Sequence, residues 1–216
     1  MSASTPAAGL RERHKQQRRE RILEAIRELL RECPDETPTV ERIAELADLS
    51  PATVFNLVGP RERQLAALSD ALLRELDACL ALAAEEDPRE QARRIVDETA
   101  ELFIADAAVS RYLVNSGGRS GALLQENPIP QLRAALRRGQ ASGMLRPDLH
   151  VEALVGHIAT AAGGALRQWA AGQISDAAFR TRVRFAVDVV FAASASEDRA
   201  AELVTPLQRK RRRGSR

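Results

Sequence analysis

The side chains best suited to chemistry are short and polar or small, and they lie between positions 50 and 56. Thr53 and Asn56 carry a hydroxyl and an amide that could hydrogen-bond to the edges of nucleic-acid bases, and an amide pairs well with adenine. Such contacts require a short helix that is held rigidly while its amino-terminal half stays exposed. We therefore asked which elements would hold residues 50–56 in place.

Start and stop signals around these residues predict three helices. Ser50 followed by Pro51 begins a helix of about residues 51–57, because Ser suits the N-cap and Pro the first helical position. Thr39 caps a preceding helix that ends near Ala47, and a longer helix over 13–33 completes a small core. The apolar spacing is typical of a helix-turn-helix: Val40, Ile43, Leu46, Leu49, Val54 and Leu57.

In order and spacing, this part of the chain resembles the TetR family over about residues 18–68. The resemblance rests on three stretches: Arg21-Ile22-Leu23-Glu24-Ala25, Thr39-Val40-Glu41-Arg42-Ile43-Ala44-Glu45-Leu46-Ala47 and Leu49-Ser50-Pro51-Ala52-Thr53-Val54-Phe55-Asn56-Leu57. Arg61-Glu62 falls where the family has a basic-acidic pair that opens its fourth helix. Beyond residue 68 the resemblance is to length and helix layout alone.

The resemblance implies an all-α fold with two parts. An N-terminal three-helix helix-turn-helix DNA-binding domain would span residues 1–66 with a basic arm, and a larger helical regulatory and dimerisation domain would span 67–200. It further implies a sequence-specific transcription regulator, a homodimer built from the last two helices, and repression of operator DNA relieved by a small-molecule ligand. Composition agrees with an all-helical chain, since Ala, Leu, Arg and Glu dominate and aromatics make up 3%.

This sequence departs from the family's pattern at the turn and on the third helix. Asp48 stands where the family's turn usually has Gly, and Asp tolerates the left-handed conformation better than most residues. Phe55 replaces a usual Tyr, so it cannot donate a hydroxyl to a phosphate. We expect Thr39 and Arg61 to contact phosphates and Thr53 and Asn56 to contact bases. The full set of candidate DNA-binding residues is Arg18, Arg19, Arg21, Thr39, Ser50, Pro51, Ala52, Thr53, Phe55, Asn56 and Arg61.

Charge is distributed unevenly along the chain. The net charge is +2, yet residues 209–216 carry six basic residues and no acid. Residues 11–21 carry six basic residues against Glu12 and Glu20, and a basic amino-terminal arm of this kind can enter the minor groove. The ordinary interpretation of both ends is a solvated, disordered segment, and we expect this of residues 201–216.

The predicted helix over 151–171 has no charge between Ala153 and Leu166 and must be buried on more than one side. Its small residues would let another helix approach closely, and the last helix, 175–195, carries an apolar stripe. We therefore expect the dimer interface to include Gly156, Thr160, Gly163, Gly164, Phe179, Val183 and Val187.

A ligand-binding pocket is expected where polar or amphipathic residues lie among apolar ones, at Tyr112, Asn115, His157 and Trp169. A mostly apolar ligand would receive one or two hydrogen bonds there. The alternative is structural: protein groups already supply the partners, and Trp169 belongs to the core, to a dimer contact or to a pocket wall.

The sequence gives less support to other classes of function. His14 and His150 give His157 no metal-ligand spacing, and no phosphate loop or nucleophile elbow is present, so we expect no metal, no cofactor and no enzyme activity. No stretch is long and uncharged enough to cross a bilayer, and two separated cysteines fit a cytoplasmic protein. The alternatives are an all-helical enzyme and a non-specific nucleic-acid-binding protein acting through its basic ends.

Overall fold

The computed structural model describes residues 6–81, 87–116 and 129–209, and these form helices joined by short loops, with no strand. The all-α fold class is therefore confirmed. The elements are α1 (Pro6–Glu32), α2 (Val40–Leu46), α3 (Pro51–Val58), α4 (Arg61–Ala81), α5 (Pro88–Ala105), α6 (Ala107–Asn115), α8 (Ile129–Ala141), α9 (Val151–Ala170), α10 (Asp176–Ala193), a 3-10 turn (Glu197–Arg199) and α11 (Ala200–Arg209).

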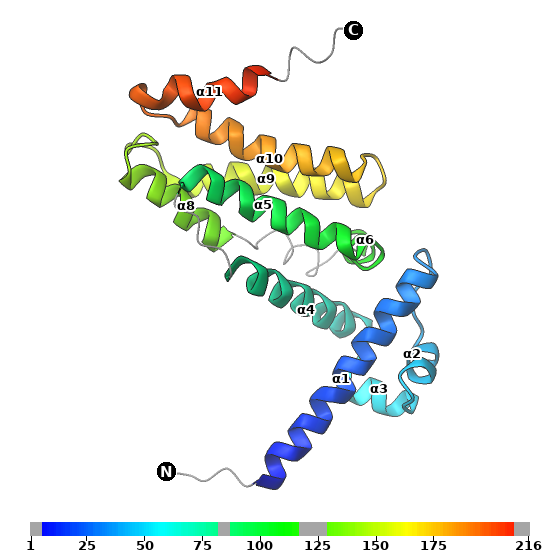
Figure 1. The fold of residues 1–216 in the computed structure, drawn as a ribbon. Helices are drawn as coiled ribbons and strands as arrows, with labels where there is room; N and C mark the ends of the chain where they lie inside the picture. The colour runs from blue at the N-terminus through cyan, green and yellow to red at the C-terminus, as the bar shows by residue number, and fades with distance from the viewer. Residues whose placement is uncertain (1–5, 82–86, 117–128, 210–216) are drawn as a thin grey trace.

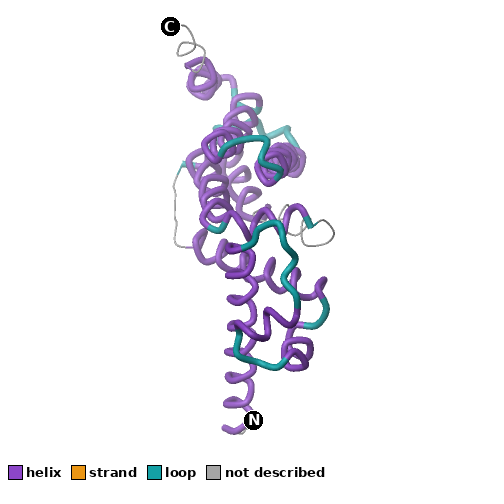
Figure 2. The backbone as a smooth tube through the Cα atoms, turned by 90° about the vertical axis from the view of Figure 1, so that its right-hand side faces the viewer, coloured by secondary structure: helices purple, strands orange, loops and turns teal. Residues whose placement is uncertain are grey.

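The molecule is elongated, with α1–α3 at one end and the layered helices α5 and α8–α11 at the other (Figures 1 and 2). We call the part from α5 onward the body. Helix α4 leads from the small unit of α1–α3 to the body, and α9 and α10 pack side by side against α5 and α8. The boundary predicted at residue 66 falls inside α4, so one helix is shared between the two parts.

A single buried core runs through both parts. Ile22 and Leu30 of α1 pack with Val54 of α3, and Leu65 and Leu68 of α4 carry the apolar contacts on towards the body. Deep in the body the rings of Trp169 and Phe179 stack with their centres 5.4 Å apart. The small unit is therefore packed onto its neighbours rather than tethered to them.

Both chain ends are helical further out than the sequence suggested. The helix predicted over 13–33 begins earlier, at Pro6, so the whole basic segment 11–21 belongs to the 27-residue helix α1. The disorder predicted from residue 201 is corrected for residues 201–209, which belong to α11. Leu203 is buried there, and the apolar spacing of Ala200, Leu203 and Val204 is the helical signal that the basic residues obscured. Residues 210–216 lie outside the described part.

Candidate nucleic-acid interface

The turn between α2 and α3 is held by local capping contacts. The Thr39 hydroxyl accepts a hydrogen bond from the backbone N–H of Arg42 at 3.3 Å, and the Ser50 hydroxyl accepts one from that of Thr53 at 3.2 Å. Asp48 has a φ of 51°, so it takes the left-handed conformation that the family's glycine would supply. The guanidinium of Arg21 donates to the carbonyl oxygens of Ala47 and Asp48, which satisfies the end of α2.

Helix α3 buries one face and exposes the other. Val54 and Val58 lie in the core, whereas Pro51, Ala52, Phe55 and Asn56 are exposed, and Thr53 and Leu57 are half-buried between the two faces. The Phe55 ring is 54% exposed even though it is large and apolar. A rigid helix is thus presented with a small, polar and aromatic outer face, the arrangement that contacts within a major groove require.

Of the basic candidates, Arg18 and Arg19 project into solvent from α1, but Arg21 is already bonded to the turn. Arg61 begins α4 and faces the body: its Nε donates to the Tyr112 hydroxyl at 3.3 Å, and its guanidinium lies 5.7 Å from the centre of the Tyr112 ring. A candidate DNA-binding residue and a candidate ligand-binding residue therefore contact each other at the junction of the two parts.

A second contact at this junction joins the end of α1 to the start of α6. The guanidinium of Arg31 donates to both carboxylate oxygens of Asp106, at 3.2 and 2.6 Å, and also to Glu24. The hydrogen bond that Arg31 donates to the Asp106 carboxylate raises the pKa of Arg31 above its ordinary value. Helix α6 is thus bonded through its first residues to α1 and through Tyr112 to α4.

The four predicted ligand-binding residues do not gather around one cavity. Asn115 donates its amide N–H to the carbonyl oxygen of Ala170 at 3.2 Å. Trp169 is fully buried and its indole N–H donates to Asp176 at 2.7 Å, so it belongs to the core. His157 is exposed and lies 12 residues before Trp169 on α9, which is about 18 Å along the helix.

Two serines, not predicted from the sequence, have the character expected of pocket residues. The hydroxyls of Ser69 in α4 and Ser110 in α6 are buried and have no hydrogen-bond partner within the described residues. An unpaired buried hydroxyl costs about 1–3 kcal/mol of folding free energy, so a hydrogen bond to a bound molecule or to water would be favourable there. Both lie on helices that meet the small unit. Serines are common in helices, and only the three-dimensional packing marks these two as buried.

A shallow groove of about 810 Å³ runs between α9 and α10 on the outer face of the body. Its apolar and small lining includes Leu154, Ala161, Gly164, Phe185 and Val189, and its polar lining includes Arg146, His157, Gln168 and Arg182. Phe185 and Val189 are 42% and 40% exposed. A methyl group added at Gly156 or Gly164 would meet no atom within 4 Å, so both glycines face open space.

The predicted interface residues divide between this face and the core. Gly156, Thr160 and, in part, Gly164 are exposed on the protomer surface. Phe179, Val183, Val187 and Gly163 are buried within the single chain, so their assignment to an interface is corrected. The stripe of α10 that contains Phe179 packs inward, with Phe179 stacked on Trp169 of α9, and the wider apolar surface of α10 makes the outer face.

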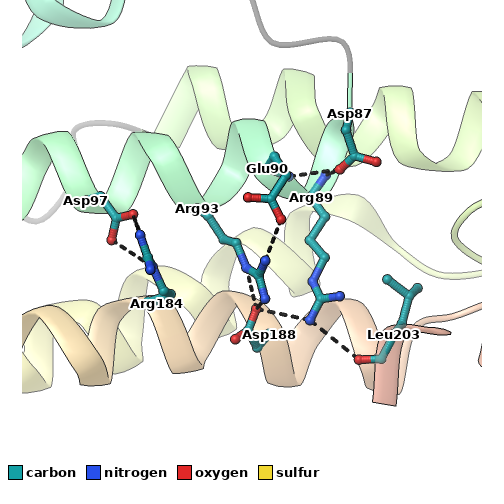
Figure 3. Close-up of polar contacts among 8 residues, drawn as sticks. All are labelled: Asp87, Arg89, Glu90, Arg93, Asp97, Arg184, Asp188 and Leu203. Atoms are coloured by element: carbon teal, nitrogen blue, oxygen red, sulfur yellow. Dashed lines mark hydrogen bonds and ion pairs between the residues drawn. The ribbon is translucent and has the colours of Figure 1, made fainter. Parts of the chain in front are cut away.

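The most extensive buried charge network joins α5, α10 and α11 (Figure 3). One carboxylate oxygen of Asp188 accepts from Arg89 at 3.2 Å and from the Nε of Arg93 at 2.7 Å, and Arg89 also reaches the carbonyl oxygen of Leu203 at 3.5 Å. Arg89 and Asp188 are both buried. No local pattern in the sequence marks this network, because its partners lie about a hundred residues apart.

The described residues contain no group of three or more His, Cys, Asp or Glu side chains that could hold a metal ion. None of the described helices combines the length and apolar character that a membrane span requires.

No family model and no curated protein sequence matches the chain, but solved structures do. A TetR-family transcriptional regulator from Rhodococcus sp. superposes with a TM-score of 0.65 at 19% identity, covering 81% of this chain and 99% of that one. A TetR regulator from Agrobacterium tumefaciens gives 0.65 at 20% identity, with 87% and 98% covered. RolR in complex with resorcinol gives 0.63 at 17% identity, with 89% and 93% covered.

These likenesses extend over nearly the whole of each neighbour. The chain therefore has the fold of TetR-family transcriptional regulators.

Proposed function

We propose that this protein is a sequence-specific DNA-binding transcription regulator that reads DNA through α3. The observation that carries the proposal is the exposed outer face of a capped, rigid α3 in a fold shared with transcriptional regulators. Asn56 and Thr53 are assigned to base edges, Phe55 to sugar or a thymine methyl group, and Thr39 to a phosphate. Ser50, Pro51 and Ala52 form the small surface that lets α3 approach the groove.

The proposal includes a homodimer assembled through the outer face of α9 and α10. Two copies related by a two-fold axis would bury Leu154, Ala161 and Val189 against their counterparts in a four-helix bundle. One recognition helix binds weakly, whereas two on a symmetry axis read two half-sites about 34–36 Å apart or at a larger spacing.

We further propose that a mostly apolar small molecule bound in the body releases the protein from DNA. The support is the pair of contacts that join α6 and the residue before it to α1 and α4, Arg31 with Asp106 and Arg61 with Tyr112. A ligand that favours another position of α6 would move α1 and α4, and with them the spacing of the two recognition helices. Ser110 of α6, whose buried hydroxyl has no partner within the described residues, is the assigned polar contact. RolR, with a related fold, binds resorcinol.

The decisive experiment selects bound sequences from a random DNA pool with the full chain and then measures affinities for the selected operator. Asn56→Ala should lose roughly 1–3 kcal/mol of discrimination at one base position per half-site. Arg19→Gln is the comparison: Arg19 is exposed on α1, and loss of a phosphate contact there should weaken binding to all sequences about equally. If no sequence is enriched, the protein is a non-specific nucleic-acid binder and this proposal is wrong.

The dimer is tested separately by sedimentation. Val189→Arg places a charge in the proposed interface and should produce monomers, because burying two unpaired charges in a self-complementary contact is costly. Ala177→Arg is the matched control: it adds the same charge to an exposed position of α10 outside the groove. A Val189→Arg variant that sediments as a stable dimer would show that another surface forms the assembly.

A further inference from the structure

The amino-terminal half of α1 extends past α3 in both views of the backbone (Figures 1 and 2). From Leu10 to Glu20 every residue is exposed. One side of this segment, with His14 and Arg18, lines a groove of about 1230 Å³ opposite Ala71, Arg74 and Ala78 of α4, so its surface is open to a partner. Its side chains indicate what that partner is.

One stripe of α1 changes character halfway along the helix. The residues Ile22, Ala25 and Leu29 recur at steps of three and four and are buried against the small unit. The same steps continued toward the amino terminus give Arg18, Lys15 and Arg11. Because a helix turns once in about 3.6 residues, these six positions form one seam. The side of α1 that faces the helix-turn-helix thus continues beyond it as a basic surface.

Basic charge is in excess on one side of this segment. Arg11, His14, Lys15, Arg18 and Arg19 lie on or beside the seam, and Glu12 reaches its edge, where it forms an ion pair with Lys15 at 3.5 Å. The opposite side holds Arg13 and Glu20, and Gln16 donates to Glu20 at 2.9 Å. A helix with an excess of basic charge on one side is suited to a polyanion that runs along that side.

The seam also lies next to the proposed recognition surface. Arg21, one turn from Arg18, already bonds to the α2–α3 turn through Ala47 and Asp48. From Arg21 to Arg11 the helix rises about 15 Å. Since phosphates follow one another about every 3.4 Å of axis on each strand, that length runs beside about four base pairs of duplex.

We propose that this basic seam of α1, defined by Arg11, Lys15 and Arg18 with His14 and Arg19 at its margins, is a second DNA-binding element. It contacts the phosphate backbone as a rigid helix beside the groove that α3 occupies. The inference rests on the proposed function for its partner, and it differs from the expectation of an arm that enters the minor groove. Contacts to phosphates add affinity and fix orientation without adding sequence preference.

The test compares a triple variant, Arg11→Gln with Lys15→Gln and Arg18→Gln, with the wild-type protein and with Arg13→Gln. All four positions are exposed on the same helix, and circular dichroism verifies that the variants remain folded. Binding to the selected operator and to random duplex is measured across a salt series. The triple variant should flatten the slope of log K against log salt by about 0.9 for each phosphate that it no longer neutralises, on both duplexes. Arg13→Gln should leave the slope unchanged.

Phosphate ethylation then locates the seam on the duplex. Ethylation at one cluster of phosphates in each half-site should interfere with wild-type binding and have no effect on the triple variant. The outcomes separate the two proposals. An operator that is selected and bound with the same slope by both proteins overturns the seam and leaves α3 as the reader. A flattened slope without any selected sequence keeps the seam and overturns the proposed function. Equal flattening by Arg13→Gln also overturns the seam, because general charge then explains the effect.

Discussion

The starts of α2 and α3 and the layer between α5 and α10 are held by polar contacts that span very different distances along the chain. At the two helix starts, Thr39 and Ser50 each cap the backbone three residues ahead. Between the two layered helices, Arg89 and Arg93 of α5 reach Asp188 of α10, 99 and 95 residues away. Short-range contacts can be recognised in a sequence from the residue type and its neighbours, whereas long-range ones depend on how whole helices are packed.

The separation of two residues in the sequence does not determine how much their ion pair contributes to stability. Arg180 and Glu101 are 79 residues apart and form a two-pronged ion pair, but both side chains are well exposed, at 41% and 54%. Arg89 and Asp188 are similarly remote in sequence and are nearly buried, at 8% and 12%. If burial determines how much a contact adds to the free energy of unfolding, the buried pair of Arg89 and Asp188 should contribute most, the local cap at Ser50 less, and the exposed pair of Arg180 and Glu101 least.

The largest effect is expected at Asp188. Asp188→Ala leaves Arg89 buried and without its carboxylate and also removes a partner of Arg93. Because an uncompensated buried charge is costly, we expect the free energy of unfolding to fall by about 3–5 kcal/mol. Urea unfolding, monitored by circular dichroism, measures this free energy.

A matched double variant isolates the reason for that loss. Replacing the pair together, Arg89→Met with Asp188→Leu, removes both charges and should be much less destabilising, since apolar residues often replace a buried ion pair at little cost. If Asp188→Ala lowers the free energy of unfolding by less than loss of the Ser50 cap does, burial does not determine the ranking of these contacts and the comparison fails.

The middle effect is expected at Ser50. Ser50→Ala removes the hydroxyl that accepts from the Thr53 N–H and should lower the free energy of unfolding by about 1 kcal/mol. Thr37→Ala serves as the control, because Thr37 is exposed in the loop before α2 and is not the N-cap of that helix. Thermal unfolding of both variants, with operator affinity measured alongside, shows whether the start of α3 is loosened. Equal losses in the two variants would rule out a capping role.

The comparison also explains which parts of the structure were predictable. The caps at Thr39 and Ser50 and the left-handed conformation of Asp48 are confirmed, because each follows from one residue and its immediate neighbours. The all-helical fold is confirmed for the same reason, since strong helix formers and stop signals are local.

The faces of α9 and α10 could not be predicted in this way. Both helices are apolar over more than one stripe, so periodicity alone gives two possible inner faces for α10. Phe179 and Val183 turned out to lie inward and Val189 outward because α5 packs against one side. The network around Asp188 and the docking of Leu203 on α10 were missed, as no local signal marks either.

The smallest effect is expected at the exposed pair of Glu101 and Arg180, and it depends on pH. The hydrogen bond from Arg180 holds the pKa of Glu101 below its ordinary value of about 4.3. A carboxylate whose pKa is lower in the folded state stabilises the protein above the unfolded-state pKa, and it loses this contribution as the pH falls through the folded-state value. A double-mutant cycle of Glu101→Gln and Arg180→Gln at neutral pH should therefore give a favourable coupling smaller than the cost of Ser50→Ala.

The coupling should vanish when the cycle is repeated well below about pH 4, and it should weaken in high salt, because exposed charges are screened by water and ions. A coupling that persists unchanged in acid would mean that the two side chains contribute through packing rather than charge. A coupling as large as the effect of Asp188→Ala would mean that burial does not determine the strength of the long-range pairs.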